Sequence, residues 1–143
     1  MVIIVSRCLL GDNCRYKGDN CLNEKVAALK KKHTIIPVCP EELGGLPTPR
    51  DPGERVGEKV ISDKGKDITE EYYRGAKFAL EIALKNGADL CVFKAKSPSC
   101  GCGVIYDGTF TGNMILGDGV TTELMKKQGI RVITELDLDA ENL

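Results

Sequence analysis

The sequence has a single histidine among 143 residues, and its formal net charge is only −1. The one histidine, His33, stands before an expected strand and far from the motifs described below, which argues against His-based catalysis and against a His-rich zinc site. A near-neutral chain also lacks the general basic surface that holds duplex nucleic acid or long RNA. We therefore do not expect a large nucleic acid as partner, although the charge leaves room for a local basic pocket.

Signals of several other protein classes are missing as well. No apolar run is long enough to span a bilayer, and residues 1–6 have neither the length nor the basic start of a signal peptide. No G-x-G-x-x-G turn follows the first apolar run, so we propose no dinucleotide cofactor. Neither an internal repeat nor a low-complexity segment divides the chain. We expect a cytoplasmic protein with one domain over residues 1–143.

The apolar runs that are present predict a sheet with helices between its strands. Strands are expected near residues 2–6, 34–38, 89–93 and 130–134. A strand, a helix and a second strand within about forty residues form a βαβ unit, in which the two strands are parallel. The predicted fold class is therefore α/β: a single Rossmann-like domain whose mostly parallel central sheet is flanked by helices.

Capping residues and turn signals define the remaining elements. Asn23 is expected to cap a helix that reaches about Lys32. Residues 67–70 resemble a capping box at the start of a helix that ends near Asn86. Smaller elements are expected as follows: a rigid irregular loop over 39–53, an edge strand or hairpin arm over 59–62, a hairpin or lid over 104–114, a helix over 119–128, and a fraying tail from 135.

Seven cysteines are a high and odd count for a chain of this length, which favours metal or redox chemistry over a disulfide scaffold. Cys8, Cys39 and Cys100 each follow an expected strand. The carboxyl ends of parallel strands share one edge of a sheet, so these thiols should converge. Three thiolates either leave one position of a zinc site open or hold a cubane iron–sulfur cluster with one exposed iron. Separately buried thiols are the alternative, and Cys91 is expected to be one.

Four stretches of this sequence resemble the TudS family, which was long catalogued as a domain of unknown function and includes thiouracil desulfidases. The resemblance runs from the first strand to the last. The stretches are Cys8–Gly11 with Cys14–Tyr16, Pro37–Glu41 with Leu43–Arg50, Ser97–Gly101 and Tyr106–Phe110.

The resemblance implies a [4Fe-4S] cluster held by Cys8, Cys39 and Cys100, which a sample prepared in air would be expected to lose. It implies a non-redox desulfidase that acts on thiouracil or a thiouridine nucleotide. The sulfur of the thiolated pyrimidine binds the open iron, and the metal polarises the C–S bond as a Lewis acid. Water then attacks the carbon, sulfide is captured on the iron, and the oxo-pyrimidine departs.

Further residues are assigned roles in that reaction. Glu41 is the expected base for water, and Ser97 is expected to orient the substrate or shuttle a proton. The alternative for Glu41 is a solvent-facing loop acid, and the alternative for Ser97 is capping of the turn around Pro98. The expected substrate-binding residues are Ser99, Lys96, Arg50 and Arg15, and the alternative for each of the three cations is an ordinary surface charge.

Two other functions remain open at this level. One is a non-catalytic iron–sulfur or zinc-binding module that carries sulfide. The other is a thiol redox protein that uses Cys100 and Cys102. The sequence leaves open whether the substrate is a free base, a nucleotide or thiolated RNA, and it gives no oligomeric state. In the desulfidase interpretation, the roles of Cys14, Cys21 and Cys102 also stay open.

Overall fold

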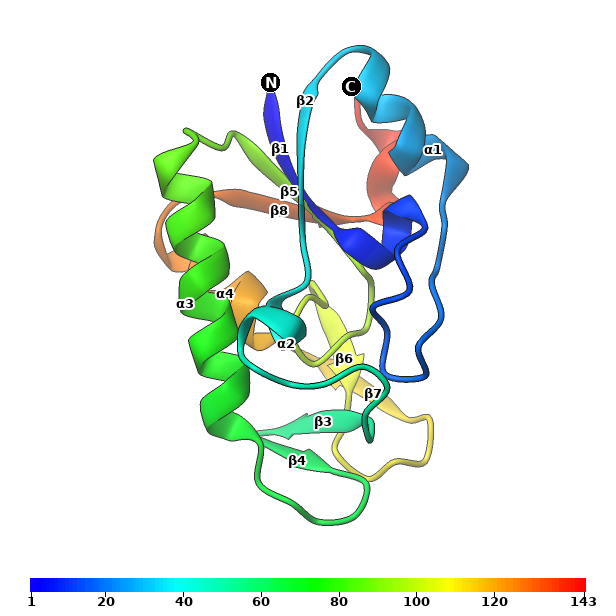
Figure 1. Cartoon of the computed structure of the whole chain (residues 1–143), viewed down its shortest axis with the longest axis vertical. Helices are drawn as coiled ribbons and strands as arrows, with labels where there is room; N and C mark the ends of the chain where they lie inside the picture. The colour runs from blue at the N-terminus through cyan, green and yellow to red at the C-terminus, as the bar shows by residue number, and fades with distance from the viewer.

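Four parallel strands form the centre of the protein (Figure 1). The computed structural model describes residues 1–143. All three strand pairings are parallel, and the strand order is β2-β1-β5-β8. The predicted α/β class with a parallel central sheet is confirmed. The strands are β1 (Val2–Ser6), β2 (Thr34–Val38), β5 (Leu90–Phe93) and β8 (Arg131–Thr134).

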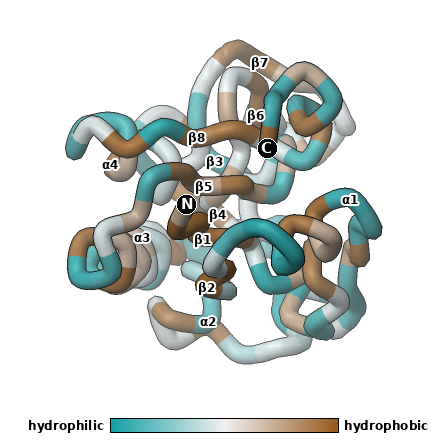
Figure 2. Tube along the Cα trace, turned by 90° about the horizontal axis from the view of Figure 1, so that it is seen from above, coloured by the Kyte–Doolittle hydropathy of each residue, from teal (hydrophilic) through white to brown (hydrophobic).

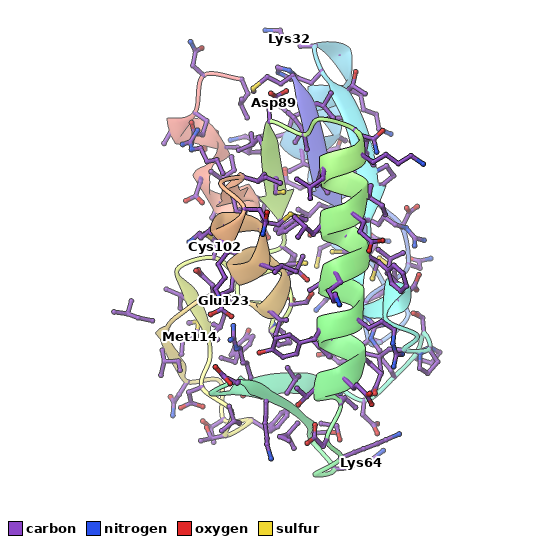
Figure 3. The ribbon with its side chains drawn as sticks, turned by 90° about the vertical axis from the view of Figure 1, so that its left-hand side faces the viewer. Lys32, Lys64, Asp89, Cys102, Met114 and Glu123 are labelled. Carbon is purple, nitrogen blue, oxygen red and sulfur yellow. The ribbon has the colours of Figure 1, made fainter.

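Helices cover both faces of this sheet because side chains alternate along each strand. Ile3 and Val5 point to the face that carries α1 (Glu24–Ala27) and the 3-10 helix η2 (Ala28–Lys31). Ile4 points to the opposite face, which carries α3 (Thr69–Lys85) and α4 (Val120–Lys127). Figure 2 shows the apolar strands between the two helical layers, and Figure 3 shows α3 and α4 side by side in front of the sheet. None of the helices combines the length and apolar character that a membrane crossing requires.

One of the two predicted helix caps is confirmed and the other is wrong. Asn23 caps α1 as predicted, because its side chain accepts hydrogen bonds from the Lys25 and Val26 amides at 3.0 and 3.1 Å. That helix changes to the 3-10 form after one turn. The predicted capping box of α3 is wrong: Ile68 is the N-cap, and Asp67 instead accepts from the Thr69 amide at 3.0 Å.

Two antiparallel hairpins lie beyond the carboxyl end of the sheet. The first joins β3 (Gly53–Val56) to β4 (Lys59–Ser62), and the second joins β6 (Val104–Tyr106) to β7 (Met114–Leu116). Both hairpin predictions are confirmed. Met114 projects away from the body of the protein (Figure 3).

Three further short helices lie in segments for which the sequence did not predict them. The 3-10 helix η1 (Arg7–Leu10) follows β1 directly. The expected loop over 39–53 begins with α2 (Pro40–Leu43), where Pro40 suits the first helical position. The tail forms the 3-10 helix η3 (Glu135–Ala140) instead of fraying, because Thr134 and Asp137 form a capping box at its start.

Two glycines let α2 lie directly against the backbone of α3. A Cβ atom on Gly75 would lie 1.8 Å from the Pro40 carbonyl oxygen, and one on Gly44 would lie 1.9 Å from that of Glu71. No other residue type fits at either position without moving the helix. This contact fixes the position of α2, and therefore of Cys39 and Glu41, relative to α3.

Candidate active site

A cavity of about 430 Å³ opens where the sheet ends. The chain runs from β1 to β2 on one side and returns to β5 on the other, so the strand order reverses next to β1. Such a switch point is where ligands bind in open α/β sheets. Cys8, Cys39 and Cys100 all line this cavity. The structure therefore brings together the three thiols that strand topology was expected to bring together.

A fourth thiol, that of Cys14, lines the same cavity. Cys14 is only 2% exposed, and the Cys39 thiol donates to its carbonyl oxygen at 3.8 Å. Its side chain also interacts with the thiols of Cys8 and Cys39. The sequence analysis gave Cys14 no role, although it lies within a motif that resembles the TudS family. All seven cysteines are free, and Cys21, Cys91 and Cys102 lie outside the lining.

Three of the cavity thiols, those of Cys14, Cys39 and Cys100, have a raised pKa. Burial raises the pKa of Cys100, and the interaction with Cys14, followed by burial, raises that of Cys39. For Cys14, Cys39 lowers the pKa, but Cys8 and burial outweigh this and raise it to about 12. A redox-active cysteine has a lowered pKa instead. These directions therefore argue against the redox alternative built on Cys100.

The set of donor atoms fits an iron–sulfur cluster, because cysteine thiolates are the usual protein ligands of such clusters. No group of three or more His, Cys, Asp or Glu side chains is arranged to hold a single metal ion. The soft thiol donors on the cavity wall suit iron and sulfide, and they would release their protons when the cluster binds.

Glu41 reaches the cavity from the first turn of α2. Both of its carboxylate oxygens have a partner: Arg50 Nη2 donates to Oε2 at 2.5 Å, and the Tyr72 hydroxyl donates to Oε1. The side chain of Glu41 is 18% exposed, whereas that of Arg50 is 5% exposed. The solvent-facing alternative for Glu41 does not hold. Its neighbour Glu42 does not line this cavity and pairs with Arg7 at 2.9 Å.

Arg50 does not line the cavity, so the structure gives no support to its predicted contact with substrate. Its guanidinium group is buried behind Glu41 and also donates to the Cys14 carbonyl oxygen at 2.9 Å and to Thr48 Oγ1 at 2.8 Å. Burial lowers the pKa of Arg50, but the Glu41 carboxylate more than offsets this, and the net direction is upward. Arg50 is thus a fully charged link between two loops of the site.

The loop after β5 carries Ser97, Ser99 and Cys100, and α4 holds it in place. The Ser97 hydroxyl oxygen accepts hydrogen bonds from the Ser99 and Cys100 amides, both at 3.1 Å. Ser97 therefore caps the turn, and its own hydroxyl proton is still available to a ligand. Ser99 also lines the cavity, but it is only 1% exposed and its hydroxyl pairs with Thr121 at 2.8 Å, so it ties the loop to α4.

Lys96 and Arg15 are the predicted cations that do line the cavity. Lys96 has a left-handed backbone (φ 69°) and forms no ion pair. Arg15 forms a 3.3 Å pair with Asp19 and lies over the ring of Tyr16. The lining also contains aromatic side chains that the sequence analysis did not single out: Tyr16, Tyr72, Tyr106 and Phe110. A cavity with soft donors, cations and flat rings suits a small planar anion or heterocycle.

The fold and cavity together define an α/β protein with a thiol-lined site that suits an iron–sulfur cluster. Comparison with known proteins gives the family. The 2-thiouracil desulfurase family matches residues 3–137, and the chain belongs to this family. The family that the sequence motifs resembled, and the prediction that the chain is an enzyme, are therefore confirmed.

Two similar proteins cover nearly the whole chain. The uncharacterized protein YbbK of Bacillus subtilis (strain 168) is 42% identical over 148 residues, which include 96% of this chain and 98% of YbbK. The solved structure of the [4Fe-4S]-dependent thiouracil desulfidase TudS matches with a TM-score of 0.91 and 44% identity, over 96% of this chain and 93% of that one. The fold is thus shared with a structurally characterised desulfidase.

Proposed function

We propose that this protein removes sulfur from a thiolated pyrimidine, such as thiouracil or a thiouridine nucleotide, with a [4Fe-4S] cluster held by Cys8, Cys39 and Cys100. The observation that carries the proposal is the convergence of these thiols on one cavity beside the half-buried carboxylate of Glu41. Family membership and the likeness to the [4Fe-4S]-dependent TudS support the same cofactor and reaction. When bound, the cluster would supply Lewis-acid chemistry toward the sulfur of the substrate.

Glu41 is the proposed general base for the attacking water. A carboxylate oxygen has two lone-pair sites, and Arg50 and the Tyr72 hydroxyl each use only one. The remaining sites on the cavity side can accept a proton from a water molecule placed next to the substrate carbon. Positioned general bases contribute about 10²- to 10⁴-fold to a rate.

Ser97 is the proposed donor to the substrate. Because its oxygen already accepts two amide hydrogen bonds, its O–H bond is the free polar group. It can donate to a ring heteroatom and hold the pyrimidine in one orientation. The backbone amides of Val120 and Thr121, at the start of α4, donate hydrogen bonds to the carbonyl oxygens of this loop. These bonds keep Ser97 next to Cys100.

Lys96 and Arg15 are proposed to neutralise the charge of the substrate. A thiolated pyrimidine carries more negative charge as water adds to its ring, and a nucleotide adds a phosphate. Lys96 has no competing partner in its vicinity, so it is the stronger candidate. The cavity volume of about 430 Å³ lies within the range of small-molecule sites, about 300–1,000 Å³.

The test is turnover of 2-thiouracil by anaerobically reconstituted protein, followed by chromatography of uracil and by sulfide release. We expect the wild type to release uracil and sulfide in equal amounts. The control variant Glu70→Gln should do the same, because Glu70 is an exposed residue on α3. Glu41→Gln should keep its iron and lose activity about 100-fold or more. A loaded wild type without turnover would indicate a sulfide-carrying module instead, and an active Glu41→Gln would remove Glu41 from the mechanism.

A further inference from the structure

We propose that Arg50 and Tyr72 are positioning residues that hold the Glu41 carboxylate in a single orientation toward the cavity. This inference rests on the role proposed above for Glu41. The two residues come from different parts of the chain: Arg50 from the loop after α2, and Tyr72 from the first turns of α3. They contact different oxygens of the same carboxylate, which fixes its plane as well as its position.

Arg50 is itself held rigidly. Its side chain donates to the carbonyl oxygens of Cys14 and Pro47, at 2.9 and 3.2 Å, and to Thr48 Oγ1 at 2.8 Å. Its backbone amide donates to the Tyr16 carbonyl oxygen at 2.7 Å. A planar guanidinium group with this many fixed partners cannot rotate away from Glu41. Arg50 therefore ties the orientation of the acid to the loop that carries Cys14.

The hydroxyl of Tyr72 has no other partner than Glu41. Its ring packs into a cluster that includes Val60, Ile68 and Val120, and this packing requires only an apolar ring. A phenylalanine would fill the same space. The hydroxyl is therefore explained by Glu41 alone, and it reaches the acid because Gly75 lets α2 lie against α3. The two residues together preorganise the acid before substrate arrives.

The experiment compares Tyr72→Phe with Tyr73→Phe in anaerobically reconstituted protein. Tyr73 is the next residue on α3, and its hydroxyl donates to the Glu58 carbonyl oxygen at 3.0 Å, away from Glu41. We expect Tyr72→Phe to lower kcat for thiouracil about 10- to 100-fold with little change in KM, because the acid is displaced. Tyr73→Phe should match the wild type. Arg50→Lys keeps the charge but loses the planar fork, and should resemble Tyr72→Phe.

Two further readouts separate positioning from a structural effect. The infrared difference between each protein and its Glu41→Gln counterpart isolates the carboxylate band of Glu41, which should shift in Tyr72→Phe and stay in place in Tyr73→Phe. Iron and sulfide per chain should be equal in all of these proteins. In the Glu41→Gln background, Tyr72→Phe should cause no further loss of activity, because it acts through the acid.

The inference is overturned if Tyr72→Phe keeps the wild-type kcat or if the infrared band of Glu41 does not move. It is also overturned if Tyr72→Phe lowers the activity by the same factor in the Glu41→Gln background. These results differ from a failure of the proposed function. In that case the loaded wild type itself shows no turnover, while the infrared band still reports whether Arg50 and Tyr72 hold the carboxylate.

Discussion

Replacing Gly75 with alanine is expected to destabilise the protein even though alanine favours helices. In an ordinary helix interior this change stabilises by about 0.5–1 kcal/mol. Here the new Cβ atom would lie 1.8 Å from the Pro40 carbonyl oxygen, and an ordinary contact needs about 3.5 Å. The two helices must therefore separate by roughly 1.7 Å, and overpacking of this kind costs about 1–3 kcal/mol.

The separation also removes the hydrogen bond from Tyr72 to Glu41, and a bond to a charged acceptor contributes about 1.5–3 kcal/mol. After the gain in helix propensity of about 0.5–1 kcal/mol is subtracted, Gly75→Ala should lower the free energy of unfolding by about 1.5–5.5 kcal/mol. The change in Tm should be on the order of 5 to 18 °C. Urea titrations followed by circular dichroism, under anaerobic conditions and at equal iron content, measure this loss.

The control is a pair of variants at Lys77, an exposed position of the same helix. Lys77→Ala should be more stable than Lys77→Gly by about 1 kcal/mol, which gives the propensity effect without a clash. If Gly75→Ala is as stable as the wild type or more stable, α2 does not depend on this contact, and the reasoning about the position of Glu41 is refuted.

Two other predictions concern the walls of the cavity. Glu54→Ala should free the 107–112 loop, because one Glu54 oxygen accepts hydrogen bonds from the Gly108 and Phe110 amides at 3.0 and 3.1 Å. Hydrogen exchange at these amides should become faster, and the free energy of unfolding should fall by about 1–3 kcal/mol. Unchanged exchange would contradict the assignment. Thr122→Val should loosen the loop that carries Cys100, because the Cys100 carbonyl oxygen accepts a hydrogen bond from the Thr122 hydroxyl at 2.8 Å. The free energy of unfolding should fall by about 1 kcal/mol, and iron should pass to a chelator faster. Iron release at the wild-type rate would contradict this prediction.

The central sheet and the convergence of thiols could be predicted from the sequence for physical reasons. Unbroken β-branched runs are typical of strands covered on both faces, and the strand spacing required parallel pairing. Parallel pairing in turn placed Cys8, Cys39 and Cys100 at one edge, without any knowledge of side-chain contacts. The TudS-like motifs added the cofactor and reaction as expectations.

The support of Glu41 could not be predicted in the same way. Tyr72 is buried among apolar side chains. The spacing of apolar residues along a helix predicts such burial, but it does not predict which group the hydroxyl contacts. Arg50 follows a loop rich in proline and glycine, so its partners depend on how that loop folds back over α2. Cys14 lies in a polar loop whose path is set by contacts with Arg50 and Cys39.

The central claim is that Cys8, Cys39 and Cys100 hold the cofactor, and counting iron and acid-labile sulfide in single Cys→Ala variants after anaerobic reconstitution tests it most directly. About four irons per chain are predicted for the wild type and for the controls at Cys21, Cys91 and Cys102, which lie outside the cavity. Loss of most of the iron is predicted for each of the three ligand variants. Full iron content in any of these three, or loss in a control, would contradict the account.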